Sequence, residues 1–168
     1  YLFVFCHIQK NLNLNNDLNY IAEIGGGYGG QALVFDRLIQ FKKYFIFDLP
    51  SVNRFSKKYL NNFYLNNSFN SMDINEYHSE LPFDLVISNY AFSELPRELQ
   101  DIYLKKVILK SKSGYMTMNT GNDINSNART NRYKASELLG IIQSSQIIEE
   151  IPLSSKDNYI IIWGDLNL

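Results

Sequence analysis

Residues 20–30 constrain the fold of this 168-residue chain more than any other stretch. The first half is a short apolar run that contains one acid, Glu23, and the second half has five glycines within six positions. An apolar run followed at once by glycines is typical of a strand that turns tightly into a helix. Glycine suits such a turn because its backbone takes positive φ and can approach a ligand closely. The stretch therefore predicts a strand, a ligand-binding loop and a helix.

Apolar runs and helical patterns alternate along the rest of the chain. The spacing of Ala32, Phe35 and Ile39, together with Val34, Leu38 and Phe41, predicts a buried helix after the glycines. Further helices are expected at 1–10, 50–59, from about 96 to 107, and at 133–143. Strands are expected at 20–24, 43–48, within 62–72, and at 83–88, 115–119, 147–153 and 159–163.

This alternation indicates the α/β class. Strands joined by helices form an open, doubly wound, mostly parallel sheet of the Rossmann-like type. Only residues 154–158 separate the last two strands, which is too short for a helical crossover, so they should form a C-terminal antiparallel β-hairpin. The expected domain is a seven-stranded sheet over residues 20–168. Residues 1–19 would be the end of an N-terminal helical region and an Asn-rich linker, with the upstream part missing.

Charge and cysteine content exclude several functions. A net charge of −1 and a pI near 6.1 argue against a surface that binds nucleic acid. Cys6 is the only cysteine, and His7 and His78 stand far apart, so neither a disulfide nor a metal site is expected. The apolar start is too short to span a membrane. These features favour a cytoplasmic protein.

The glycine loop fits two nucleotide-containing cofactors. Gly25, Gly27 and Gly30 have the G-x-G-x-x-G spacing of dinucleotide sites. Gly25, Gly27 and Gly29 have the G-x-G-x-G spacing of enzymes that use S-adenosylmethionine. The glycines alone do not choose between them.

Two acids favour S-adenosylmethionine. Glu23 precedes the first glycine by two residues, where it would be poorly placed beside a pyrophosphate but suits a ligand that carries an ammonium and a sulfonium. Asp48 lies at the end of the second strand, 25 residues after Glu23, and can hold the two ribose hydroxyls that either cofactor offers. An NAD-dependent oxidoreductase or epimerase is therefore the alternative enzyme, and a truncated, non-catalytic cofactor-binding module is the alternative without activity.

Three motifs carry a family resemblance. They are Glu-Ile-Gly-Gly-Gly-Tyr-Gly-Gly, Phe-Asp-Leu-Pro-Ser-Val and Phe-Asp-Leu-Val-Ile-Ser-Asn-Tyr-Ala-Phe-Ser-Glu-Leu-Pro. The chain resembles class I S-adenosylmethionine-dependent methyltransferases of the bacterial sugar O-methyltransferase family, from Tyr20 to the end. The first two motifs are also similar to plant-type small-molecule O-methyltransferases. The resemblance implies transfer of a methyl group to a sugar hydroxyl in polysaccharide or glycan biosynthesis, with a small-molecule or glycan acceptor as partner.

The resemblance also implies which residues touch the cofactor. The methionine part would lie among Glu23, Gly25, Gly26, Gly27, Tyr28 and Gly29. Ribose and adenine would lie at Asp48 and Leu49, the adenine edge along Met72 and Asp73, and the methyl-transfer site beside Asn89 and Tyr90. Asp48 and Asp73 also suit purely structural positions, as a helix cap and a loop acid.

The catalytic base does not carry over from the plant-type enzymes, because Ser93 stands where they have a histidine. Ser93 and Glu94 are the catalytic candidates, although both residue types also cap helices. Glu94 is the nearest acid that could take a proton from a hydroxyl acceptor. His78 is a weaker candidate for the base. Arg129 and Arg132 could hold an anionic acceptor such as a sugar nucleotide, or could serve only solubility.

Overall fold

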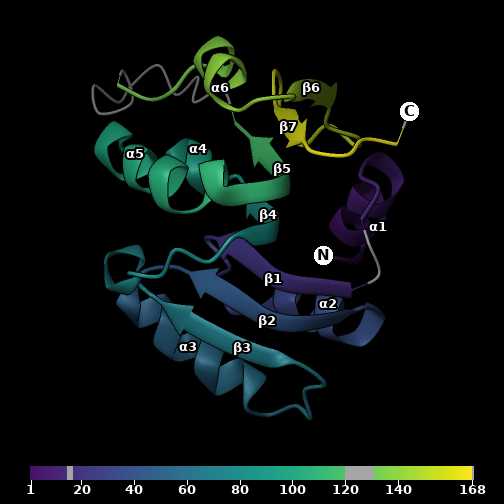
Figure 1. Cartoon of the computed structure of the whole chain (residues 1–168), viewed down its shortest axis with the longest axis vertical. Coiled ribbons are helices and arrows are strands. Elements are labelled where there is room, and N and C mark those ends of the chain that lie inside the picture. The colour runs from purple at the N-terminus through teal and green to yellow at the C-terminus, as the bar shows by residue number, and fades with distance from the viewer. Residues whose placement is uncertain (15–16, 120–130, 168) are drawn as a thin grey trace.

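The computed structural model describes residues 1–14, 17–119 and 131–167. Within these ranges seven strands form one sheet in the order β3-β2-β1-β4-β5-β7-β6 (Figure 1). Only β7 is antiparallel to its neighbours, β5 and β6. The predicted doubly wound sheet with a terminal hairpin is confirmed. The strands are β1 (Asp17–Ile24), β2 (Gln40–Phe47), β3 (Ser68–Met72), β4 (Phe83–Asn89), β5 (Ser111–Met118), β6 (Gln146–Glu149) and β7 (Tyr159–Trp163).

Helices cover both faces of the sheet. Those described are α1 (Leu2–Asn11), α2 (Gly30–Leu38), α3 (Pro50–Leu60), α4 (Ala91–Glu94), α5 (Arg97–Lys106) and α6 (Ala135–Ile141), with the short 3₁₀ turns η1 (Ile74–Glu76) and η2 (Ile108–Lys110). One core cluster joins α1, α2 and α3 to the sheet, and a second joins α4, α5 and α6 to the opposite face. Because both faces are covered, the central strands are nearly continuous apolar runs.

The order of the strands reverses its direction between β1 and β4. Strands β1 and β4 are neighbours, but α2, which follows β1, and α4, which follows β4, pack on opposite faces. The loops after these two strands therefore diverge. In open α/β sheets ligands bind at this point, outside the carboxyl ends of the strands.

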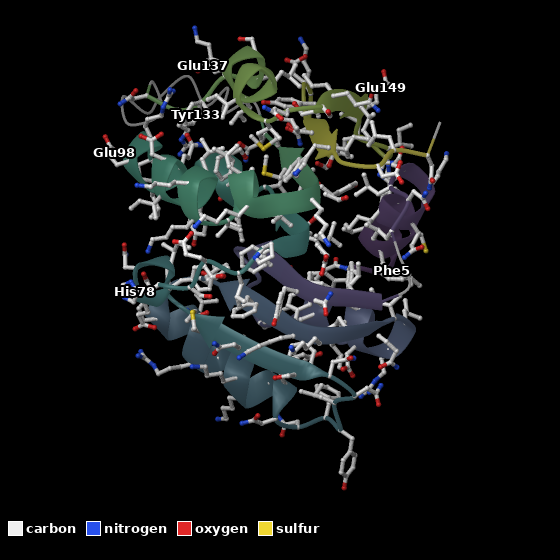
Figure 2. The ribbon with its side chains drawn as sticks, in the orientation of Figure 1. Phe5, His78, Glu98, Tyr133, Glu137 and Glu149 are labelled. Carbon is white, nitrogen blue, oxygen red and sulfur yellow. The ribbon has the colours of Figure 1, made fainter. Side chains whose placement is uncertain are left out.

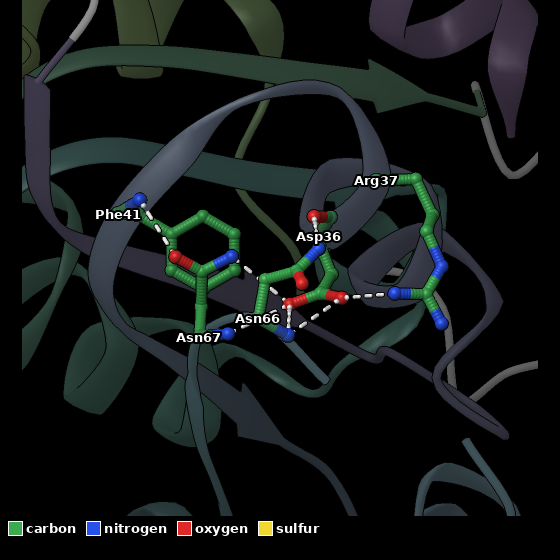
Figure 3. Close-up of polar contacts among 5 residues, drawn as sticks. All are labelled: Asp36, Arg37, Phe41, Asn66 and Asn67. Atoms are coloured by element: carbon green, nitrogen blue, oxygen red, sulfur yellow. Dashed lines mark hydrogen bonds and ion pairs between the residues drawn. The ribbon is translucent and has the colours of Figure 1, made fainter. Parts of the chain in front are cut away.

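At the opposite edge of the sheet, where the parallel strands begin (the amino edge), a buried acid joins several elements. Asp36, near the end of α2, is 1% exposed and accepts hydrogen bonds from the backbone N–H groups of Asn66 and Asn67, both at 2.9 Å (Figure 3). It also pairs with Arg37 at 3.0 Å. Asn67 in turn accepts a hydrogen bond from the N–H of Phe41 at the start of β2. This cluster fixes the starts of β2 and β3 to the end of α2.

Several predicted boundaries were wrong. The helix expected to reach Phe41 ends at Leu38, and Ile39 is already extended, with φ −141°. Phe41 lies in β2. It follows Leu38 by three residues, which is a helical spacing, but the two residues belong to different elements. The strand expected at 147–153 ends at Glu149, and Ile151 and Leu153 are more than half exposed.

The described residues on both sides of 15–16 belong to regular structure or to its contacts. The helix expected at 1–10 is present as α1, and Leu12 forms an antiparallel bridge with Leu166. The N–H of Asn13 donates to the carbonyl of Asp165 at 2.8 Å, and β1 already begins at Asp17. Figure 1 shows α1 beside the C-terminal tail. Within the described ranges no helix combines the length and apolarity that crossing a membrane requires.

Candidate functional site

The glycine loop has the backbone that its sequence predicts. Gly25, Gly27 and Gly29 have φ values of 73°, 56° and 93°, which disfavour residues with a Cβ. A Cβ at Gly25 would lie 2.1 Å from the Cβ of Ala91, so the loop packs directly against the segment after β4. A Cβ at Gly27 would meet nothing within 4 Å. The loop is thus in direct contact with the segment after β4, whereas the space beside the Cα of Gly27 is free.

Asp48 ties the end of β2 to this loop. One carboxylate oxygen accepts a hydrogen bond from the N–H of Gly27 at 2.9 Å, and the other accepts one from the N–H of Leu49 at 2.7 Å. The backbone carbonyl of Asp48 accepts a hydrogen bond from the Asn53 amide, which begins to order α3. The side chain is half-buried at the carboxyl edge. It can therefore support the loop and still face a ligand.

Glu23 lies beneath the loop and is 2% exposed. Within the described part of the chain its one hydrogen-bond donor is the hydroxyl of Tyr44, at 3.0 Å. A Cβ at Gly26 would lie 2.9 Å from the Glu23 carboxylate, which places the acid directly under the loop backbone. Burial raises the pKa of Glu23 to about 7, the Tyr44 hydrogen bond opposes that rise, and the charge of Asp48 adds to it. Among the described residues Glu23 has no ion pair, so the loop covers an acid whose charge the chain does not neutralise.

The other predicted cofactor residues gather at the same edge. Leu49 is 62% exposed, and Met72 is partly buried at the end of β3. Asp73 accepts hydrogen bonds from the backbone and side-chain amides of Asn75, both at 2.8 Å, and so caps η1. Tyr28 lies between two rings, with centroid distances of 5.7 Å to Tyr1 and 4.9 Å to Tyr59.

The last residue of β4 has an unsatisfied acceptor, and the residue after it has an unusual backbone. The side-chain oxygen of Asn89 is buried and has no hydrogen-bond partner among the described residues. Tyr90 has φ 65°, which is rare for an aromatic residue. Its N–H donates to the carbonyl of Thr117 at 2.8 Å, and its hydroxyl contacts Glu150 and Ser154. The sequence did not indicate the last two residues, because they reach Tyr90 only through the placement of β7 beside β5.

The two catalytic candidates, Ser93 and Glu94, differ in exposure and in hydrogen bonding. Ser93 is 5% exposed, donates a hydrogen bond to the carbonyl of Tyr90 at 2.6 Å and accepts one from the N–H of Asn119 at 3.1 Å. Glu94 is exposed and accepts one hydrogen bond from the Asn119 amide at 3.0 Å. The hydroxyl of Ser93 is thus committed to local structure, whereas the carboxylate of Glu94 remains accessible.

The remaining candidates fall in different places. Arg132 donates hydrogen bonds to the backbone carbonyls of Ser93 and Glu94, so it lies beside both catalytic candidates. His78 follows η1 by two residues, and Figure 2 shows it apart from Tyr133, the neighbour of Arg132. His78 is therefore not part of this group. Arg129 lies outside the described residues. In the described part of the chain no group of three or more His, Cys, Asp or Glu side chains could hold a metal ion.

Solved structures match the chain, whereas no protein-family model and no curated protein does. The methyltransferase domain of a bacterial Hen1 protein (CtHen1-CN) is 11% identical, with TM-score 0.67, and the match covers 96% of this chain and 95% of that one. An S-adenosylmethionine-dependent methyltransferase from Clostridium acetobutylicum is 12% identical, with TM-score 0.64 and coverage of 96% and 89%. The N-methyltransferase NodS from Bradyrhizobium japonicum is 11% identical, with TM-score 0.63 and coverage of 99% and 92%. These matches establish the methyltransferase type of Rossmann-like fold.

Proposed function

We propose that this chain binds S-adenosylmethionine and transfers its methyl group to a hydroxyl group, with a sugar of a polysaccharide or its precursor as the acceptor. The observation that carries the proposal is the pair of acids at the glycine loop. Glu23 lies under the loop without a neutralising cation, and Asp48 accepts the N–H of Gly27 from the side. A ligand with an ammonium and a sulfonium supplies the charge that this pair lacks.

The same observation disfavours a dinucleotide. Pyrophosphate binding at a glycine loop depends on backbone N–H groups that are free to donate to phosphate. Here the N–H of Gly27 already donates to Asp48, and a phosphate would face both that carboxylate and Glu23. Repulsion between these charges makes an NAD-dependent oxidoreductase the poorer account of the site.

The residues present fit the proposed cofactor in three further respects. The half-buried carboxylate of Asp48 can accept hydrogen bonds from the ribose hydroxyls. The open side of Gly27 leaves room for a ligand against the loop backbone. The unpartnered oxygen of Asn89 can accept a hydrogen bond from a ligand ammonium, which would satisfy a buried group that is otherwise costly.

Bound S-adenosylmethionine supplies a methyl group on a positively charged sulfur, which is already activated for in-line displacement. The protein then has to align the acceptor hydroxyl and remove its proton. Alignment alone supplies much of the acceleration in such reactions. We assign the proton to Glu94, because its carboxylate is exposed and accepts one hydrogen bond from the described residues, whereas the hydroxyl of Ser93 is engaged by its neighbours.

The acceptor can be found with isotopically labelled S-adenosylmethionine. The purified protein is incubated with labelled cofactor and a panel of sugar nucleotides and glycans, and the products are analysed by mass spectrometry. Comparison of cell glycans with and without the gene then tests the sugar assignment. A labelled methoxy group on a sugar is the expected result. Methylation only of amines, or no transfer to any member of the panel, would refute the sugar O-methyltransferase proposal.

Glu94→Gln tests the base. We expect the variant to bind the cofactor as the wild type does and to transfer methyl at least about tenfold more slowly at neutral pH. A variant with the wild-type rate at every pH would remove Glu94 from this role.

A further inference from the structure

Tyr90 is held in place by residues from a distant part of the chain. Its backbone is in the left-handed region, with φ 65° and ψ −28°, which is unfavourable for a residue with a large side chain. A strained conformation persists only where surrounding contacts hold it. The contacts that hold Tyr90 are therefore informative about the site, because Tyr90 lies between Asn89 and the Ala91–Gly25 contact.

Glu150 is the centre of those contacts. It directly follows β6, is 8% exposed, and accepts a hydrogen bond from the hydroxyl of Tyr90, 60 residues earlier in the chain. Its other oxygen accepts a hydrogen bond from the N–H of Ser154 at 3.0 Å. The hydroxyl of Ser154 lies 2.8 Å from that of Tyr90 and accepts a hydrogen bond from the Asn158 amide at 3.0 Å. Glu150 thus fastens the loop before β7 to the turn after β4.

The protonation states suit this arrangement. Burial alone would raise the pKa of Glu150, but hydrogen bonds from Tyr90 and Ser154 lower it overall, so the carboxylate stays ionised at neutral pH. Burial and the hydrogen bond to Glu150 raise the pKa of the Tyr90 phenol, which therefore keeps its proton. The donor and the acceptor have fixed roles.

The position of Tyr90 also affects the glycine loop. The next residue, Ala91, lies so close to Gly25 that a Cβ on Gly25 would clash with the Cβ of Ala91. The preceding residue, Asn89, carries the buried oxygen that has no partner. A rotation of the backbone at Tyr90 would therefore move both neighbours relative to the glycine loop.

We propose that Glu150 is a positioning residue of the cofactor site, which acts through Tyr90 to hold the turn after β4 against the glycine loop. The proposal depends on the proposed function, because S-adenosylmethionine is the probe that tests it. The hydrogen bonds that Glu150 accepts come from Tyr90 and Ser154 and not from the glycine loop, and Glu150 belongs to none of the cofactor motifs of the sequence.

A double-mutant cycle with calorimetry tests this role. Binding of S-adenosylmethionine is measured for the wild type, Glu150→Ala, Tyr90→Phe and the double variant. We expect each single variant to bind about tenfold more weakly, and the double variant to bind no more weakly than either single one, because both changes break the same contact. Glu150→Gln should restore most of the affinity, since its amide oxygen still accepts the Tyr90 hydroxyl. Glu149→Ala is the matched control, because Glu149 is the adjacent acid on β6 and is exposed (Figure 2); its affinity should stay within about twofold of the wild type.

Three results would overturn the role of Glu150: wild-type affinity in Glu150→Ala, additive losses in the double variant, or an equal loss in Glu149→Ala. Thermal unfolding is measured on every variant, and if Glu150→Ala does not fold, Tyr90→Phe and Glu150→Gln decide the matter. If the wild type itself fails to bind S-adenosylmethionine, the proposed function falls and this inference falls with it. If the wild type binds and the variants bind equally well, only this inference falls.

Discussion

The amino edge and the carboxyl edge of the sheet each contain a buried acid, but the two acids differ in the hydrogen-bond donors around them. At the amino edge, Asp36 is 1% exposed and accepts hydrogen bonds from Asn66, Asn67 and Arg37 (Figure 3). At the carboxyl edge, Glu23 is 2% exposed and accepts one, from Tyr44. Burial is nearly equal, so the difference lies in how many donors the chain provides.

A second acid at the amino edge follows the pattern of Asp36. Asp84, at the start of β4, accepts hydrogen bonds from the N–H groups of Asn19 and Tyr20 and pairs with Lys112. Burial would raise the pKa of Asp84, but these donors lower it overall. The amino edge thus uses its acids to hold the fold together. At the carboxyl edge, within the described residues, Glu23 has no ion pair and the side-chain oxygen of Asn89 has no hydrogen-bond partner.

The largest expected effect is at the amino edge. Asp36→Ala leaves the N–H groups of Asn66 and Asn67 without their acceptor, so we expect a loss of about 4 kcal/mol in the free energy of unfolding. Urea titration measures this loss. Affinity for S-adenosylmethionine should be unchanged in the folded protein. A loss below about 1 kcal/mol would show that this edge is not fixed by its buried acid.

The next effect is a dependence of the unfolding free energy on pH, which the raised pKa of Glu23 causes. Its pKa is about 7 in the folded chain and near 4.5 when unfolded. Below pH 4.5 both states hold the proton, so Glu23 costs nothing. Between pH 4.5 and 7 the unfolded chain releases the proton and the folded chain keeps it, so stability falls by up to about 3 kcal/mol and then levels off.

Glu23→Gln isolates this effect from the other titrating groups. The difference in unfolding free energy between the variant and the wild type should grow in favour of the variant from pH 5 to pH 8. Urea titrations at the two pH values measure it, and the Gln side chain can still accept the Tyr44 hydroxyl. A difference that is the same at both pH values would mean that Glu23 is ionised and neutralised in the fold, as Asp84 is.

A smaller effect separates a glycine of the site from a glycine of the scaffold. Gly25→Ala combines positive φ with a clash against Ala91, and we expect a loss of about 2 kcal/mol together with weaker cofactor binding. The control is Gly140→Ala in α6, where a Cβ meets nothing within 4 Å and φ is ordinary. That variant should gain up to about 1 kcal/mol in thermal unfolding, because Ala favours helix. Equal effects at the two positions would contradict the role of the loop.

Much of the fold could be predicted from local sequence. The glycine loop, the acid at Asp48 and the apolar runs of β2 and β4 are signals carried by neighbouring residues, and all lie where they were expected. The errors occurred where local signals agreed by chance with the wrong element. Phe41 continued a helical spacing but belongs to β2, and Asn residues concealed the start of β1 at Asp17.

Less of the candidate site could be predicted from local sequence. The role of Asn119 depends on a contact with a residue 25 positions away, which the pairing of β4 with β5 brings near. The role of Glu150 depends on a contact with a residue 60 positions away, which requires β7 beside β5. Likewise, the burial of Glu23 against Tyr44 depends on the register between β1 and β2. Sequence could place an acid near a cationic ligand but could not show that the chain leaves its charge unneutralised.

The most direct test of the central claim is calorimetry of the wild type and Asp48→Ala with S-adenosylmethionine and with NAD at pH 8. We predict that the wild type binds S-adenosylmethionine and not NAD, and that Asp48→Ala binds it at least about tenfold more weakly while unfolding at a similar temperature. Binding of NAD without binding of S-adenosylmethionine would contradict the account of the acids at the carboxyl edge.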